Sequence, residues 1–272
     1  MAAGLPYVTL PDTSAQAAQP YGLLVMLGVG LGALVAVRLG RRRGLTGEDL
    51  GVLVPSSVGA ALVAGHLFDV AWYDASSARA PGRWLRFTDG HSRVGALAGV
   101  AVVALIVAAV RRLDRRRVAD VLSIGALVAL AIGRIGCALV HDHLGVTTDA
   151  VIGVDMPAYL ARDDYHRPAG VDVLRVHDLG LAELLALLVL VPVAFALLRR
   201  WRTRPGLTAA VVAIAYAIVR FALDFLRLPS TEPTRGGLTG GQWGMAVLLG
   251  VALVGLIRVR HAGVPVASAR YV

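Results

Sequence analysis

The fold of this chain is decided by the stretch Gly133-Arg134-Ile135-Gly136-Cys137-Ala138-Leu139-Val140-His141-Asp142-His143-Leu144-Gly145. Its first part continues an apolar run that begins near Val118, and one arginine interrupts that run. The run then ends in the polar cluster His141-Asp142-His143. An ionisable side chain inside an apolar helix of membrane length is costly unless it is paired or functional. We therefore expect Arg134 to belong to a functional site.

The composition is that of a membrane protein. Of 272 residues, 57% are hydrophobic and 17% are charged, and the mean hydropathy is +0.68. A helix needs roughly 20 residues to cross the hydrocarbon core, and only helices and closed barrels satisfy their backbone there. The sequence predicts an all-α integral membrane protein, one polytopic domain over residues 1–272. Its seven transmembrane helices are expected at about Tyr21–Val37, Leu50–Trp72, Val94–Val110, Val118–Val140, Leu179–Leu198, Leu207–Leu226 and Gln242–Ile257.

The basic residues are all arginines, and their clusters predict the orientation. They follow the first, third, fifth and seventh segments, at 38–43, 111–117, 199–204 and 258–260. The positive-inside rule places these clusters in the cytoplasm, so the N-terminus is expected outside and the C-terminus inside. The net charge of +9 is then a topology signal, and we expect no nucleic-acid partner. Outer loops are expected at 74–93, 141–178 and 228–241, the second forming a small cap.

Two intramembrane arginines are expected at the same height. Counting 1.5 Å per helical residue from the cytoplasmic charges puts Arg134, Arg220 and His66 about 25 Å away in each case. Glu183, counted inward from the outer side, falls at a similar height. Guanidinium groups suit phosphate oxygens, and the anion available in the outer leaflet is a phospholipid headgroup. The absence of a charged path to the cytoplasm argues against a transporter.

The sixth helix carries further charged residues next to Arg220. Arg220, Asp224 and Arg227 are spaced i, i+4 and i+7 and share one face, so Asp224 can pair with either arginine. Such pairing alone could be purely structural. Two helices that bring arginines to one height favour an anion site instead.

Three groups of residues together resemble the prolipoprotein diacylglyceryl transferase family, over nearly the whole chain from Tyr21 to Trp243. The first is Gly133-Arg134-Ile135-Gly136, with Asp142 and Gly145 following it. The second runs from Tyr216 to Arg227 on the sixth helix. The third is Leu238-Thr239-Gly240-Gly241-Gln242-Trp243, and His177 with Glu183 keeps two further motif positions.

The resemblance implies a seven-helix enzyme of the bacterial inner membrane whose site faces the outer leaflet. Such an enzyme transfers a diacylglyceryl group from phosphatidylglycerol to the lipobox cysteine of a prolipoprotein signal peptide, without a cofactor. The expected partners are therefore these two substrates and membrane lipid. The expected catalytic residues are Arg134, Arg220, Asp142, His141 and His143. The expected substrate-binding residues are Tyr21, His66, His91, Glu183, Tyr216, Asp224, Arg227 and Gln242.

The chain departs from the family pattern where the acceptor would be handled. The family has a His-Gly-Gly-Leu motif at the start of the third helix, and Val94 stands at the histidine position here. Cys137 stands where an asparagine is usual. The base could then be His91, His141 or His143, because histidine titrates near neutrality. A divergent member could use another acceptor or water, or could be a non-catalytic lipid-binding protein.

A metal site is the alternative for the polar residues of the second outer loop. His141, Asp142 and His143, with Asp163, Asp164, His166 and His177, offer imidazole and carboxylate groups that suit zinc. No spacing among them is diagnostic, so we expect no metal. Cys137 is expected to be a small buried residue rather than a nucleophile. His66 and Asp69 could bond across helices instead of contacting a headgroup.

Overall fold

The computed structural model describes residues 4–8, 20–73, 79–87, 90–160, 165 and 170–261. Asp163, Asp164 and His166 lie outside these residues. The seven predicted helices are confirmed, and each is long and apolar enough to cross a membrane. They are α1 (Pro20–Arg42), α2 (Gly47–Trp72), α3 (Arg93–Val110), α4 (Arg115–Val140), α5 (Leu179–Arg200), α6 (Leu207–Leu223) and α7 (Gly240–His261). A short 3-10 turn, η5 (Asp224–Leu226), continues α6.

Side-chain caps start three of the helices. Thr46 accepts a hydrogen bond from the Asp49 amide at the start of α2, as its position predicts. Asp114 caps α4 and Asp178 caps α5 in the same way. At its C-terminal end α4 stops at His141, a left-handed residue with a φ of 49°. This residue reverses the chain, so the residues after it fold back toward the last turn of α4.

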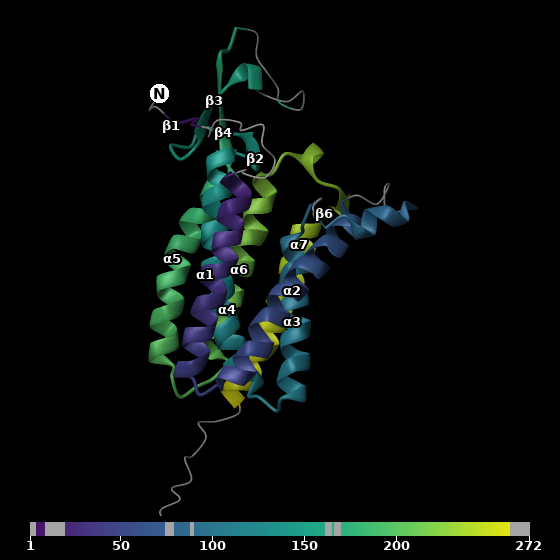
Figure 1. Ribbon diagram of the computed structural model, residues 1–272. Helices are drawn as coiled ribbons and strands as arrows, with labels where there is room; N and C mark the ends of the chain where they lie inside the picture. The colour runs from purple at the N-terminus through teal and green to yellow at the C-terminus, as the bar shows by residue number, and fades with distance from the viewer. Residues whose placement is uncertain are drawn as a thin grey trace, which may run out of the picture.

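The helices form two adjoining groups (Figure 1). In one, α1 packs along α4, and α4 also contacts α5 and α6; in the other, α2 packs along α3. Helix α7 contacts both α6 and α3 and so joins the groups. Close approach depends on glycines: a Cβ on Gly32 would meet the carbonyl of Gly125, and one on Gly99 would meet the carbonyl of Ala60. Gly30 has no described neighbour within 4 Å of such a Cβ.

A small sheet covers the end of the bundle at which α4 finishes. Its strands are β1 (Leu5–Pro6), β2 (Leu144–Thr147), β3 (Val154–Pro157) and β4 (Val173–Asp178), in the order β1-β3-β4-β2. β1 runs parallel to β3, and the other pairs are antiparallel. Met156, Tyr165, Val176 and Leu228 form a core beneath the strands. The cap was predicted, whereas its strands were not.

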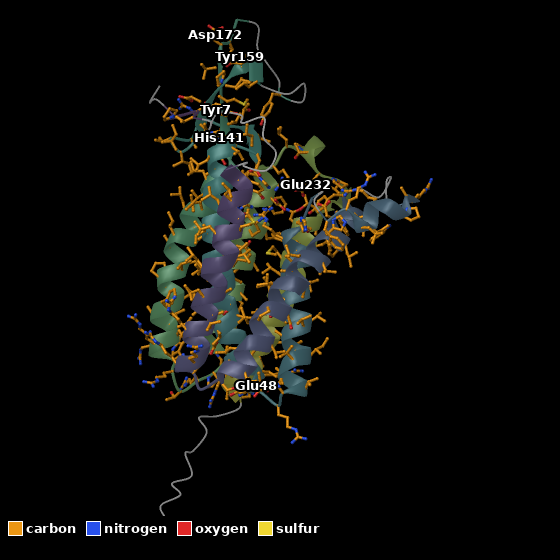
Figure 2. All side chains as sticks on the ribbon, in the orientation of Figure 1. Tyr7, Glu48, His141, Tyr159, Asp172 and Glu232 are labelled. Carbon is orange, nitrogen blue, oxygen red and sulfur yellow. The ribbon has the colours of Figure 1, made fainter. Side chains whose placement is uncertain are left out.

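Short elements complete the capped end of the bundle. They are the 3-10 turns η3 (Pro81–Leu85), η4 (Ala158–Leu160) and η6 (Pro229–Thr231), and the hairpin of β5 (Thr234–Arg235) and β6 (Leu238–Thr239). Figure 2 shows Tyr159 and Asp172 at the tip of the cap, Glu48 at the opposite end of the bundle, and Glu232 beside the capped ends of the helices.

Candidate functional site

One buried carboxylate, that of Glu183 in the first turns of α5, gathers groups from three other helices. Only 1% of the residue is exposed. Arg134 of α4 donates from Nη2 to Glu183 Oε2, and Arg220 Nε of α6 lies 3.3 Å from the same oxygen. Arg93 of α3 donates from Nη1 to Oε1 and Oε2 at 3.2 and 3.1 Å. The Tyr216 hydroxyl donates to Oε1 at 2.9 Å. The equal height predicted for Arg134 and Arg220 is therefore confirmed.

A second carboxylate, Asp224, holds the other side of the site. It accepts hydrogen bonds from Arg220 Nη1 at 2.5 Å and from Arg227 Nε at 3.1 Å, so it pairs with both arginines. Thr239 Oγ1 donates to Asp224 at 2.7 Å. Gln242 and Thr239 exchange hydrogen bonds at the start of α7, each at 3.0 Å, which positions the threonine.

The site carries an excess of positive charge. Four guanidinium groups, those of Arg93, Arg134, Arg220 and Arg227, face the three carboxylates of Glu183, Asp224 and Glu232. Burial raises the pKa of Glu232, against the opposing effect of Arg227, which lies 2.9 Å from it. A carboxyl group that ionises less readily neutralises less of the arginine charge. The arrangement therefore favours an anion.

Arg134 has hydrogen-bond donors to spare. Only 2% of the residue is exposed, and Nε and Nη1 have no acceptor among the described residues. Buried donors without a partner cost free energy, and charged ones cost more than neutral ones. An anion with several oxygens would satisfy these donors. Arg134 is thus the clearest indication that a ligand belongs here.

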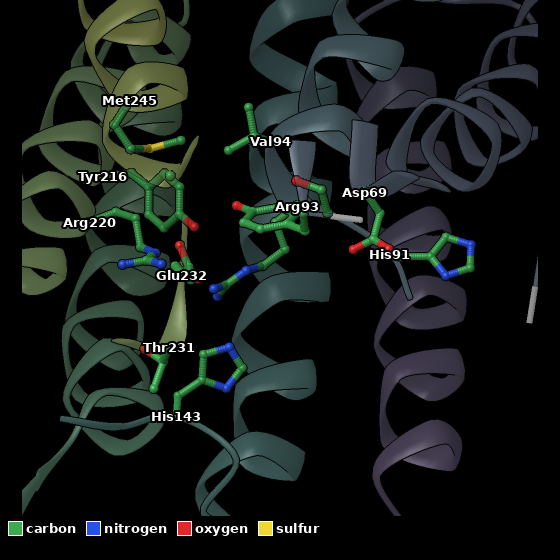
Figure 3. Close-up of a pocket in the computed structure, with 13 residues that line it drawn as sticks. Asp69, His91, Arg93, Val94, His143, Tyr216, Arg220, Thr231, Glu232 and Met245 are labelled. Carbon is green, nitrogen blue, oxygen red and sulfur yellow. The ribbon is translucent and has the colours of Figure 1, made fainter. Parts of the chain in front are cut away.

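A pocket of about 280 Å³ opens beside part of this network: Arg93, Arg220 and Glu232 line it, whereas Arg134, Glu183 and Asp224 are not among its lining residues. Figure 3 shows Tyr216, Arg220 and Met245 on one side, Asp69 and His91 on the opposite side, and Arg93 and Val94 between them. The Arg93 side chain extends toward Arg220 and Glu232.

Val94 fills the position where the resembled family has its histidine. A Cβ added to Gly244 of α7 would lie 2.7 Å from one Val94 methyl carbon, which shows how closely α3 and α7 approach there. An apolar side chain therefore occupies this part of the pocket wall.

Of the three histidines considered as a base, two line the pocket. His143 lines the pocket, and its Nδ1 contacts Asp142. Burial lowers the pKa of His143. His91 lines the pocket on the side of Asp69, and burial lowers the pKa of His91 as well. His141 lies elsewhere: its Nδ1 is 2.6 Å from Asp178, and its ring stacks on Tyr7 in the cap (Figure 2).

Two expected binding residues occupy separate places. His66 lies within hydrogen-bond distance of two carbonyls of the segment between α2 and α3, that of Gly90 at 3.3 Å and that of Arg83 at 3.2 Å, rather than beside Arg134 and Arg220. Tyr21 lies next to Gly136 and Cys137 in the last turns of α4. His177 is on β4, beside Gly145.

Arg93 and Glu232 belong to the site but were not identified from the sequence, and Thr239 was recognised only as part of the motif from Leu238 to Trp243, without a role at the site. An arginine at the first residue of an apolar helix is typical of an interfacial anchor that extends into water. Here its side chain extends to Glu183 instead. The position of Arg93 directly before Val94 was the available indication. Glu232 is in a polar loop, where a single side chain carries no distinguishing pattern.

Comparison with the sequences of known proteins identifies the family of this chain. The family model described as prolipoprotein diacylglyceryl transferase matches residues 14–258. A phosphatidylglycerol–prolipoprotein diacylglyceryl transferase of Thermosynechococcus vestitus is 28% identical, over 90% of this chain and 90% of its own length. The phosphatidylglycerol–prolipoprotein diacylglyceryl transferase 2 of Streptomyces coelicolor is 30% identical, over 96% of this chain and 84% of its own length. This chain therefore belongs to the prolipoprotein diacylglyceryl transferase family.

Proposed function

We propose that this membrane enzyme transfers a diacylglyceryl group from phosphatidylglycerol to the cysteine thiol of a prolipoprotein signal peptide. The observation that carries the proposal is the pair Arg134 and Arg220 on one buried carboxylate, with two donors of Arg134 unsatisfied. Membership of the family and the names of the relatives support the same reaction.

The reaction breaks the bond between the diacylglyceryl carbon and a phosphate oxygen, and it forms a carbon–sulfur bond. The electron pair of the broken bond stays with glycerol phosphate, and the proton of the thiol is transferred to that phosphate or to solvent. Arg134 and Arg220 bind the phosphate and stabilise the charge that grows on the leaving oxygen. Donors that are fixed before the reaction in a site without water are effective at this task.

Glu183 and Asp224 position these arginines rather than act on substrate. Each arginine is held by at least one carboxylate, so its side chain has little freedom to turn away. Arg93 adds a second cation to the pocket wall beside Arg220. The acceptor thiol is placed on the side of His143, since this histidine lines the pocket with Arg93 and Arg220. The site thus has one side that binds the phosphate and another side that receives the thiol.

The proposed location is the bacterial inner membrane, with the site open to the outer leaflet. The arginine clusters lie at the ends of α1, α3, α5 and α7, away from the cap. The positive-inside rule then puts the cap and the pocket on the outer side. Phosphatidylglycerol can enter from that leaflet with its acyl chains still in the membrane.

The test uses purified protein with phosphatidylglycerol in detergent micelles and a synthetic lipobox peptide. Glycerol phosphate release and the peptide mass are measured together. The expected result is both release and a peptide heavier by one diacylglyceryl group. Release without modification would show another acceptor or water, and neither product would indicate a lipid-binding protein.

Arg220→Ala tests the site, with Arg258→Ala at the exposed inner end of α7 as the matched control. Loss of one fixed donor to a developing charge lowers turnover by roughly 10²- to 10³-fold, so release should nearly vanish in Arg220→Ala only. Melting temperatures of both variants show whether they are folded. Unchanged release in a folded Arg220→Ala variant would refute the assignment.

A further inference from the structure

Three potential metal ligands meet at the outer end of α4. The left-handed conformation of His141 turns the chain back, so Asp142 and His143 return to the helical turn that contains Cys137. One ligand atom from each of Cys137, Asp142 and His143 lies within 4.8 Å of the other two. Cys137 is 5% exposed, whereas His143 lines the pocket. The cluster is therefore buried on the helix side and open on the pocket side.

The donor set is one that suits zinc. A thiolate, a carboxylate and an imidazole are all zinc ligands, and sites with three protein ligands keep a fourth position open for water or substrate. The charges of Cys137 and Asp142, when both are ionised, balance a divalent cation. Ligand atoms around tetrahedral zinc lie roughly 3.3–3.8 Å apart, given bond lengths of about 2.0–2.3 Å. The three ligand atoms now lie within 4.8 Å of one another, so the ion would draw the more distant atoms closer and would separate His143 from Asp142, whose direct contact it replaces.

We infer that Cys137, Asp142 and His143 form a binding site for a divalent cation, with zinc as the chemical match, whose open position takes the acceptor thiol as a thiolate. The inference rests on the proposed function for the identity of the acceptor. A thiol that coordinates such an ion loses its proton at neutral pH. The coordinated sulfur then attacks the diacylglyceryl carbon, and the bond from that carbon to the phosphate oxygen breaks. Glycerol phosphate leaves with the electron pair, and the released thiol proton ends on it.

Arg93 fits this arrangement. With the acceptor bound as a thiolate, the ion and its ligands carry one net negative charge. Arg93 lines the same pocket as His143 and interacts electrostatically with both Cys137 and His143. Its guanidinium is held by Glu183, next to the arginines proposed to bind phosphate. Arg93 therefore lies between the proposed thiol side and the phosphate side.

The chain has a single cysteine, so a spectroscopic test can be assigned without ambiguity. The full-length protein in detergent is treated with a chelator, dialysed, and titrated with Co²⁺ in place of zinc. A thiolate-to-cobalt charge-transfer band is expected, saturating at one equivalent and absent in Cys137→Ser. Asp142→Asn and His143→Gln should weaken binding by roughly 10-fold or more each. His141→Asn is the matched control, because asparagine tolerates the left-handed conformation and His141 lies outside the cluster.

Addition of the lipobox peptide tests the open position. A second thiolate on cobalt should increase the charge-transfer band about twofold, and a peptide with serine in place of cysteine should not. No thiolate band in the wild-type protein would overturn the metal site, and a band that the peptide leaves unchanged would overturn its role toward the acceptor. Neither result affects the proposed function, which depends on whether Arg220→Ala loses glycerol phosphate release.

Discussion

Arg93 and Glu183 form a two-oxygen contact between the start of α3 and the start of α5, in which one guanidinium nitrogen donates to both carboxylate oxygens. Glu183 also receives Arg134 and Arg220, so a single negative charge is shared by three cations from three helices. The carboxylate is thus both the organiser of the site and a tie between the two groups of helices.

Glu183→Gln should therefore destabilise the protein strongly. The amide keeps the shape of the side chain but removes the charge, and breaking a buried ion pair in this way costs about 3–5 kcal/mol. The melting temperature in detergent should fall by several degrees or more. Glu48→Gln is the matched control, since Glu48 is exposed and solvent screens its pair with Arg111, so its loss should change the melting temperature little. Equal melting temperatures for the two variants would contradict the role given to Glu183.

Arg134→Lys should separate binding from folding. A lysine can keep the charge next to Glu183, but it lacks the fork that leaves Nε and Nη1 of Arg134 free for a ligand. We expect glycerol phosphate release to fall by roughly 10²-fold, with a much smaller change in melting temperature. Arg38→Lys, at an exposed position of α1, should leave release unchanged. If Arg134→Lys retained full activity, the unsatisfied donors would have no part in phosphate binding.

The helices and the arginine site were predictable because they follow from local quantities. Hydropathy over about 20 residues locates a spanning segment, and the rise per residue gives the depth of Arg134 and Arg220. The spacing of Arg220, Asp224 and Arg227 on one helix likewise places them on one face, which is why their pairing was predicted. None of these inferences needs a contact between distant segments.

The features that were not predictable depend on distant segments. β1 is two residues long and pairs with β3, which lies far later in the chain. Strands this short do not stand out in the sequence, and their pairing cannot be read from either segment alone. Arg93 belongs to the site only because the rotation of α3 and α5 brings it to Glu183. The left-handed conformation of His141 determines that Asp142 and His143 meet Cys137, and the sequence of this stretch does not specify that conformation.

Two glycines of α1 provide a matched pair for testing helix packing. A Cβ on Gly32 would meet the carbonyl of Gly125 and lie 2.9 Å from the Ala129 Cβ, whereas a Cβ on Gly30 meets no described atom within 4 Å. Gly32→Ala should destabilise the protein by about 1–3 kcal/mol through overpacking of α1 against α4. Gly30→Ala should be neutral or stabilise it by up to about 1 kcal/mol. Thermal unfolding compares them, and the reverse order would refute the packing.

The attachment of β1 to the cap should depend on pH. Hydrogen bonding from Arg175 lowers the pKa of Asp155, which also accepts a hydrogen bond from the Gly4 amide at 2.9 Å. Because the folded-state pKa is the lower one, the stabilisation is present above the unfolded value of about 3.9 and is lost as the pH falls through the folded value.

Hydrogen exchange of residues 4–8, corrected for intrinsic rates, measures this effect. Protection of the Leu5 amide, which donates to the Gly153 carbonyl, should fall in that acidic range. Asp155→Asn should show, at every pH, the low protection that the wild type shows only in acid. Asp172→Asn, exposed at the tip of the cap, should resemble the wild type (Figure 2). Constant protection down to pH 2 in the wild type would contradict the prediction.

Val94→His should restore an imidazole to the pocket wall at the family's histidine position. Val94 lines the same pocket as His143 and Arg93, and we expect an imidazole at position 94 to reach the acceptor thiol across this pocket. In a His143→Ala background, which should modify the lipobox peptide poorly, Val94→His should increase modification at least about 10-fold, since a positioned base contributes roughly 10²- to 10⁴-fold. Val94→Leu in the same background controls for repacking against Gly244 and should bring no recovery. If the folded Val94→His double variant were no more active than the Val94→Leu one, position 94 would lie out of reach of the thiol, and the valine would have only a packing role between α3 and α7.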